Sequence, residues 1–162
     1  MKDLLDKLSS YNLFNYLFPG VLFVLISNFF TDYNFIQEND FIGVFLYYFI
    51  GMIISRFGSL IIEPILKAIS FVKFLDYEIF IKISKNDEKI ELLSEANNTY
   101  RTISAMLILL LLLKLYNWLQ NLLGIQDTVT QIVLLVLILL LFLFSYKKQT
   151  KYIVSRIDKQ NK

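Results

Sequence analysis

Four long runs of apolar residues alternate with shorter polar segments along this chain. A helix needs about 20 mostly apolar residues to cross the roughly 30 Å hydrocarbon core of a bilayer. Unbroken apolar blocks such as Met106–Leu113 favour helices over the alternating strands of a closed barrel. The sequence therefore predicts an all-α membrane protein, a single unit over residues 1–162, with four transmembrane helices: Leu13–Phe30, Phe41–Ile62, Ile103–Leu123 and Val129–Phe144.

The basic residues are distributed asymmetrically around these spans. Of the 16 lysines and arginines, all but Arg56 and Lys114 lie in the N-terminal segment, in the connection 63–102 or in the C-terminal tail. The connections Thr31–Asp40 and Gly124–Thr128 contain none. Basic residues that flank spans are retained in the cytoplasm. We therefore expect both termini and the connection 63–102 to be cytoplasmic.

The composition narrows the chemistry. A mean hydropathy of +0.56 and a hydrophobic fraction of 56% disfavour a soluble helical bundle. The chain has no cysteine and no histidine, which excludes disulfides, thiol catalysis, imidazole catalysis and most transition-metal sites. Phosphate-binding glycine loops and nucleophile-elbow motifs are absent as well. The spacing of Glu91 and Glu95 is typical of a solvated helix face. We expect no enzyme activity, no cofactor and no metal.

The polar segments have their own helical patterns. Residues 1–12 predict a short amphipathic helix, and the tail after Tyr146 predicts a basic helix or arm that binds anionic lipid. For the connection 63–102 we expect a cytoplasmic helical hairpin. Its first helix would cover Ile65–Ile83, with a break at Ser84–Asn86. Its second helix would start near Asp87 and run into the third span.

Two prolines lie in or beside the spans. Pro19 stands within the first span, where it is either an ordinary kink or a hinge that shapes a pore, because proline removes a backbone hydrogen bond. Pro64 is expected to end the second span.

The second span has small residues at a four-residue spacing: Gly43, Gly51, Ser55 and Ser59, with Tyr47 in the remaining step. Residues four apart share one helix face, and small side chains there let two helices approach closely. This face predicts a helix–helix seam, either within the subunit or between subunits.

Arg56 lies inside the second span, where a charge is costly and usually faces protein or water. Two interpretations stay open. Arg56 snorkels to the inner headgroups, or it pairs with Glu63 or with an acid of a neighbouring subunit at a pore mouth. Lys114 either snorkels to the outer interface beside Trp118 or faces a pore. The candidate pore or oligomer seam consists of Gly51, Ser55, Arg56, Ser59 and Glu63.

Three functional classes remain: a homo-oligomeric channel, a membrane scaffold whose cytoplasmic hairpin binds a partner protein, and a small transporter. The transporter is disfavoured because the two halves show no internal symmetry. A chain with four spans has little room for an internal aqueous path, so a channel requires several copies. The polar residues that would then face its axis are Asn15, Ser27, Asn28, Tyr47, Tyr48, Ser55, Arg56 and Ser59.

Three runs carry a resemblance to a known family: YNLFNYLFPG at 11–20, RFGSLIIEP at 56–64 and LSEANNTYR at 93–101. They resemble small bacterial membrane effectors of anti-phage defence, nearest the channel effector of the Hailong system. The resemblance implies a homo-oligomeric ion channel of the bacterial inner membrane. It also implies a partner nucleotidyltransferase that makes short single-stranded DNA oligomers, which keep the channel closed.

The basic cytoplasmic face suits such a ligand, because single-stranded nucleic acid binds to lysines and arginines interleaved with aromatic rings. The alternative is that these charges only set the topology. The candidate contacts are Lys82, Lys85, Lys89, Tyr100 and Arg101.

Overall fold

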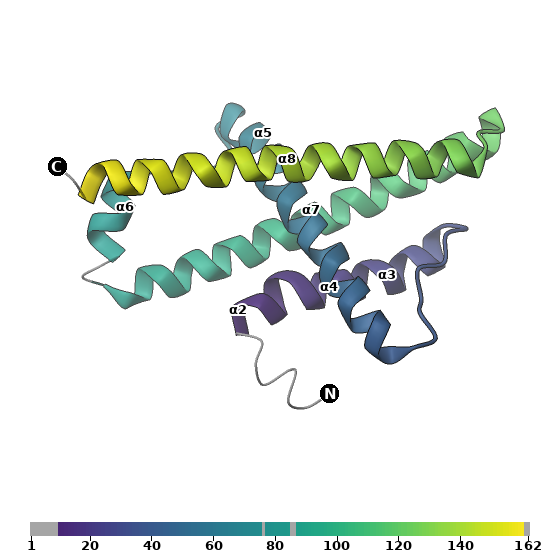
Figure 1. The fold of residues 1–162 in the computed structure, drawn as a ribbon, viewed down its shortest axis with the longest axis horizontal. Coiled ribbons are helices and arrows are strands. Elements are labelled where there is room, and N and C mark those ends of the chain that lie inside the picture. Colours follow the sequence, from purple (N-terminus) through teal and green to yellow (C-terminus); the bar gives the residue numbers. More distant parts are fainter. Residues whose placement is uncertain (1–9, 76, 85–86, 161–162) are drawn as a thin grey trace. The chain divides into compact units, whose positions relative to one another are not determined.

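The computed structural model describes residues 10–75, 77–84 and 87–160, which form helices joined by short connections and include no strand (Figure 1). The chain divides into two compact units, Met1–Asn117 and Trp118–Lys162. Four helical stretches are long and apolar enough to cross a membrane: Leu13–Phe30, Asp40–Ala68, Lys89–Leu123 and Asp127–Ile157. The predicted all-helical fold with four apolar helices is confirmed. The first stretch has the predicted bounds, and the other three extend beyond theirs.

The first stretch begins with α2 (Ser10–Asn12), widens into the π-helical turn η1 (Leu13–Leu17) and continues as α3 (Phe18–Phe30). In η1 the N–H of Phe18 donates to the carbonyl of Leu13, one residue further back than in an α-helix. The helix then passes through Pro19 without ending. Of the amphipathic helix predicted over residues 1–12, residues 1–9 lie outside the described part of the chain.

The second stretch joins α4 (Asp40–Phe57), η2 (Gly58–Ile62) and α5 (Glu63–Ala68). Asn39 caps its start, since its side chain accepts from the N–H groups of Phe41 and Ile42. The expectation that Pro64 ends the span is wrong. The N–H of Glu63 donates to Gly58 across the π turn, and Pro64 follows at the first turn of α5, where a missing N–H is tolerated.

One helix over Ile65–Ile83 is also wrong, because α5 ends at Ala68. Ser70 adopts a left-handed conformation with φ of 59°. The N–H of Phe71 then donates to Leu66 (2.9 Å) and the N–H of Ser70 to Lys67 (3.0 Å), which is the Schellman arrangement that terminates helices. An irregular segment leads to α6 (Tyr77–Ser84).

The remaining helices are long. α7 spans 36 residues, Glu88–Leu123, which confirms a helix that starts near Asp87 and runs into the third apolar stretch. Within the second unit, Gly124 (φ 64°) turns the chain into α8, which covers 34 residues, Asp127–Gln160. The tail after Tyr146 is therefore helical, as expected. Gln120 fastens this turn by donating to the Asp127 carboxylate at 2.9 Å.

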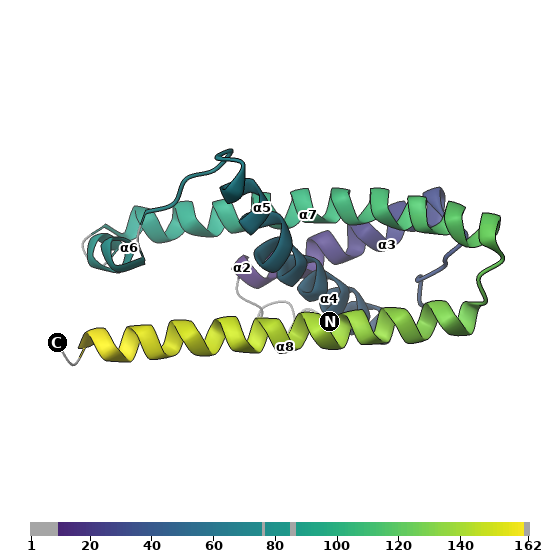
Figure 2. The same cartoon turned by 90° about the horizontal axis from the view of Figure 1, so that it is seen from above.

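Within the first unit, α3 runs alongside α7 and α4 crosses them, as both views show (Figure 2). The crossing is close enough that backbones touch. A Cβ on Gly51 would lie 1.7 Å from the carbonyl oxygen of Tyr16, and one on Gly20 would lie 1.8 Å from that of Tyr47. The seam predicted at Gly51 is thus a contact within the chain. A small apolar cluster lies beside it: Ile54, Ile62, Ala105, Met106 and Leu110.

Candidate functional site

Three buried polar side chains meet where the first helix, α4 and α7 converge. We call Asn15, Ser55 and Thr102 the inner polar layer. The Thr102 hydroxyl lies 2.7 Å from the Oδ1 of Asn15, and the Nδ2 of Asn15 donates to the Ser55 hydroxyl at 3.3 Å. All three side chains are almost fully excluded from solvent. Because buried polar groups are costly unless paired, these bonds fix how the three helices meet.

Each member of the inner polar layer comes from a different kind of local structure. Asn15 lies in the π turn η1, and Ser55 lies one turn after Gly51 on α4, so the close crossing brings it to η1. Thr102 stands at the boundary between the polar and apolar parts of α7, where its hydroxyl also lies 2.9 Å from the Asn98 carbonyl. A hydroxyl donates one proton, and its shortest contact is with Asn15.

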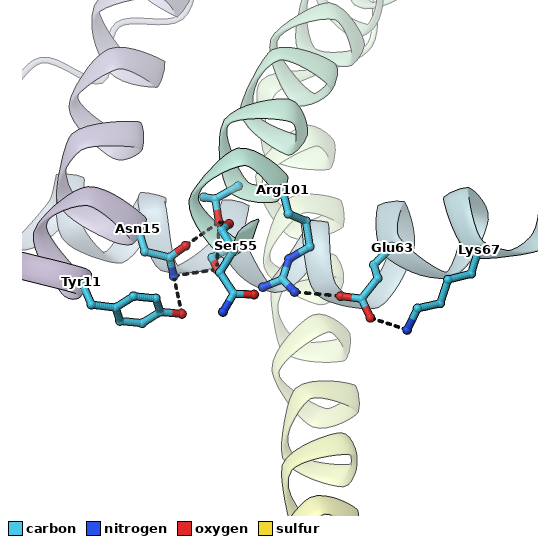
Figure 3. Close-up of polar contacts among 8 residues, drawn as sticks. Tyr11, Asn15, Ser55, Glu63, Lys67 and Arg101 are labelled. Atoms are coloured by element: carbon cyan, nitrogen blue, oxygen red, sulfur yellow. Dashed lines mark hydrogen bonds and ion pairs between the residues drawn. The ribbon is translucent and has the colours of Figure 1, made fainter. Parts of the chain in front are cut away.

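Tyr11 extends the inner polar layer toward the N-terminus, because its hydroxyl accepts from the Nδ2 of Asn15 at 3.3 Å (Figure 3). Burial is the main cause that raises the pKa of Tyr11, and the neighbouring Tyr16 adds to it. The positive charges of Arg101 and Arg56 act in the opposite direction. The phenol is therefore neutral at physiological pH and can serve as a hydrogen-bond acceptor.

An ion-pair triad lies beside this layer and consists of Glu63, Lys67 and Arg101 (Figure 3). One carboxylate oxygen of Glu63 is 2.7 Å from Arg101 and the other is 2.8 Å from Lys67. The side chains of Glu63 and Arg101 are 10% and 19% exposed, against 43% for Lys67. The Glu63–Arg101 pair thus joins α5 to α7 in a mostly desolvated setting. The Nε of Arg101 is buried and has no hydrogen-bond partner among the described residues.

Arg56 is half-buried in α4, between Ser55 and the π turn η2. Among the described residues it forms no ion pair. Its expected partner Glu63 instead contacts Arg101 and Lys67. The predicted pairing of Arg56 with Glu63 within the chain is therefore wrong. The physical reason is the continuous helix through Pro64, which presents Glu63 to α7 and to the next turn of α5.

A second polar contact joins the other end of α3 to α7. Asn117 accepts from the backbone N–H of Asp32 at 3.3 Å and donates to the Asp32 carboxylate at 2.9 Å. We call this pair the outer clamp. Along α7, Thr102 and Asn117 are about 22 Å apart at 1.5 Å per residue. The inner polar layer and the outer clamp therefore bracket a largely apolar segment somewhat shorter than a bilayer core.

The structure separates the residues that were expected to face a pore axis. Asn15, Ser27 and Ser55 are buried within the chain, and Ser27 bonds to the carbonyl of Val24 in its own helix. For these three an orientation toward an axis is wrong. Asn28 is exposed, and Ser59 is half-buried in η2. Arg56 is the member of the predicted seam whose charge the described part of the chain does not balance.

The five candidate oligonucleotide contacts are not gathered into one site. Arg101 is engaged by Glu63, whereas Lys89 and Tyr100 are exposed on α7, about 16 Å apart along the helix. The side chain of Lys82 and the whole of Lys85 lie outside what the structure describes. Ligand binding by these residues stays a prediction.

Sequence reasoning missed Thr102, Asn117 and Asp32. The sequence signal for them was weak. Each stands at or near a boundary of an apolar run, at the same level along the helices as a polar residue of another helix. Among the described residues, no group of three or more acidic side chains is placed to hold a metal ion. Comparisons with protein families, curated proteins and solved structures find no match to this chain. Its function therefore has to be argued from these residues.

Proposed function

We propose that this protein is a multi-pass protein of the bacterial inner membrane that assembles into a homo-oligomeric ion channel, with N- and C-termini in the cytoplasm. The observation that carries the proposal is Arg56, a charge inside an apolar helix without an acidic partner in the described part of the chain. The resemblance of three sequence runs to defence effectors gives the channel its proposed setting, in which it depolarises the cell upon phage infection.

The charge balance around Arg56 supports an environment in which either water or an acidic residue of another copy of the chain contacts its guanidinium group. Arg56, Lys67 and Arg101 provide three positive charges, and among the described residues the carboxylate of Glu63 pairs with Lys67 and Arg101 but not with Arg56. An unbalanced arginine in a membrane helix faces water, headgroups or protein, because lipid solvates it poorly. Arg56 lies about 10 Å from Glu63 along the helix, toward the start of α4. A water-filled path, or an acid from another copy of the chain, would satisfy its charge.

The apolar surface of one chain also favours assembly. Only 28% of the most apolar window is buried in each of the first two candidate spans. Lipid or further copies must cover the rest. Since one chain leaves little interior for an aqueous path, we place the path between copies, with Arg56 at its cytoplasmic end.

Control of opening is proposed to reside in α7. The cytoplasmic part of this helix, before Thr102, carries Arg101 and continues without a break into the membrane part, which begins with Thr102. Any force on the cytoplasmic part therefore reaches the inner polar layer and the ion-pair triad first. Short oligonucleotides at Lys89 and Tyr100 are a proposed source of such a force.

The test is ion flux from liposomes that contain the purified protein, with and without short single-stranded deoxyoligonucleotides. We expect flux, and we expect Arg56→Gln to change the anion-to-cation permeability ratio by several-fold, because it removes a charge from the path. Lys151→Gln is the control, since Lys151 is an exposed basic residue of α8 that lies outside the predicted spans. Its flux should resemble that of the unmodified protein.

Two outcomes would count against the channel. No flux from protein that protease protection shows to be inserted would favour the scaffold, whose cytoplasmic segments bind a partner protein. A strictly monomeric protein in native mass spectrometry would exclude a path between copies. Flux that oligonucleotides leave unchanged would retain the channel and remove this ligand.

A further inference from the structure

Bulky apolar side chains are exposed on the connection that follows α5. Ile69, Phe71 and Leu75 have 66%, 75% and 73% of their surface exposed, although none lies in a candidate span. In α6, Ile79, Phe80 and Ile83 are exposed too, and Ile79 and Phe80 share a helix face with Ile83, at spacings of four and three residues. So many large apolar side chains left exposed along one segment indicate a binding surface. We call residues 69–75 and 77–83 the apolar connection.

The apolar connection is held against α5. The ammonium group of Lys67 lies 4.1 Å from the ring centroid of Phe74, a cation–π contact. Lys67 also pairs with Glu63, which pairs with Arg101 of α7. A continuous set of contacts therefore joins Phe74 to the ion-pair triad.

The chemistry of the apolar connection favours the interface of a bilayer. It starts one residue after Ala68, the end of a stretch that is apolar enough to cross a membrane. Irregular backbone is not tolerated in the hydrocarbon core, but a short amphipathic helix lies in the headgroup region with its apolar face inward. The sequence 69–83 contains Lys73 and Lys82 against Asp76 and Glu78, so it has no net charge. Its attraction to a membrane would therefore be hydrophobic and would not require anionic lipid.

We propose that the apolar connection lies in the headgroup–acyl boundary of the inner leaflet and binds phospholipid there, so that its position is transmitted through Phe74, Lys67 and Glu63 to Arg101. The inference rests on the membrane insertion assumed in the proposed function. It does not require that the protein conducts ions.

The experiment places a polarity-sensitive fluorophore at single cysteines in the full chain, which has no cysteine of its own. Phe71→Cys and Ile79→Cys report on the apolar connection. Leu92→Cys is the matched control, because Leu92 is 68% exposed but lies on the polar part of α7. Each labelled protein is reconstituted in nanodiscs of phosphatidylcholine, alone or with phosphatidylglycerol. Nitroxide groups on the lipid and iodide in the water serve as the two quenchers.

We expect nitroxide lipid to quench the probes at 71 and 79 several-fold more strongly than the probe at 92, equally in both lipid mixtures. Iodide should show the reverse order. Probes at 71 and 79 that follow iodide as the Leu92 probe does would overturn the proposal. Protection from both quenchers would overturn it as well, because protein rather than lipid would then cover the patch. A variant that is not monodisperse is set aside, and the other position decides. The same samples assayed for flux report separately on the channel.

Discussion

The two ends of the α3–α7 contact are built differently. At the outer clamp, a single pair joins the helices, in which Asp32 is exposed and Asn117 is buried. At the inner polar layer, three helices contribute buried side chains, and an ion-pair triad lies beside them. Both π turns belong to this inner region, and so does Arg56. Two hydrogen bonds join the helices at the outer end. The inner end contains several polar and charged groups that are mostly excluded from water, so they depend on one another as partners.

This difference indicates where the protein can be controlled. A buried hydrogen bond that breaks leaves groups without water, so a change at the inner end has a large energetic consequence. At the outer clamp Asp32 is exposed, so water can replace a hydrogen bond that it loses. We therefore expect the loss of stability caused by a substitution to depend more on which end of the α3–α7 contact it affects than on the type of residue replaced.

The largest effect is expected from the helix crossing that brings Ser55 to the inner polar layer. Gly51→Ala places a methyl group into the Tyr16 backbone, so α4 and η1 must separate, at a cost of about 3 kcal/mol or more. Thermal unfolding in detergent, followed by circular dichroism, measures the loss. Gly43→Ala is the control. Its methyl would approach the Tyr47 ring at 3.3 Å, and that side chain can move. Equal melting temperatures for the two variants would contradict the close crossing.

Removing the acid of the ion-pair triad should come next. Glu63→Gln leaves Arg101 mostly buried without a counter-charge, which costs about 3 kcal/mol for a desolvated pair. Lys67→Gln should cost less than about 1 kcal/mol, because the Lys67 side chain is 43% exposed and surface pairs contribute little. The same unfolding measurement compares them. If Lys67→Gln proved the more damaging change, the assignment of Arg101 as the main partner would be wrong.

A direct comparison of the two ends uses one substitution type. Asn15→Leu removes the central member of the inner polar layer and should destabilise the protein by about 2 kcal/mol, since Ser55 and Thr102 keep only each other and the Asn98 carbonyl. Asn117→Leu should cost about 1 kcal/mol, because water can solvate Asp32. Hydrogen exchange read by mass spectrometry localises each effect. Equal losses, or a larger loss at Asn117, would remove the distinction between the ends.

The smallest expected effect has the opposite sign. Ser70 holds a left-handed conformation at the end of α5, where glycine is favoured. Ser70→Gly should therefore leave the fold unchanged and raise the stability by about 0.5–1 kcal/mol, because the left-handed conformation costs serine about 1–2 kcal/mol, which exceeds the entropy of about 0.5–1 kcal/mol that glycine adds to the unfolded chain. Ser70→Val is the contrasting variant, since a β-branched residue is disfavoured there. A higher melting temperature for valine than for glycine would contradict the helix end described here.

The four apolar helices were predictable because their signal lies in the local composition. The continuation of the second helical stretch through Pro64 was not predictable, since the rule that proline ends helices ignores the π turn at Gly58–Ile62, and nothing in GSLII marks it. The end of α5 was missed for a similar reason. Its termination depends on a left-handed serine, a conformation with a weak sequence signal.

The site was predictable only in part. Gly51 and Ser55 were identified as a seam by their four-residue spacing, which is a property of one helix. Their partners Tyr16, Asn15 and Thr102 come from two other helices, and a single sequence does not say which polar residues share a depth. Glu63 was given Arg56 as its partner because both are on one helix. The actual partner, Arg101, is 38 positions away.

Because of the two π turns, the orientation of side chains along these helices depends on the number of residues in each turn. A π turn closes with one residue more than an α turn, so each acts as an insertion that the helix has absorbed. Deleting one residue from Gly58–Ile62 would restore an ordinary α turn and leave the residues after it close to their present orientation. Deleting one residue from the regular part of α4 would instead rotate everything after it by about 100°. Only the deletion outside the π turn would turn Glu63 away from Arg101. In a lineage of such chains, single-residue insertions and deletions would reach the charged centre of the molecule more directly than most substitutions of its apolar residues.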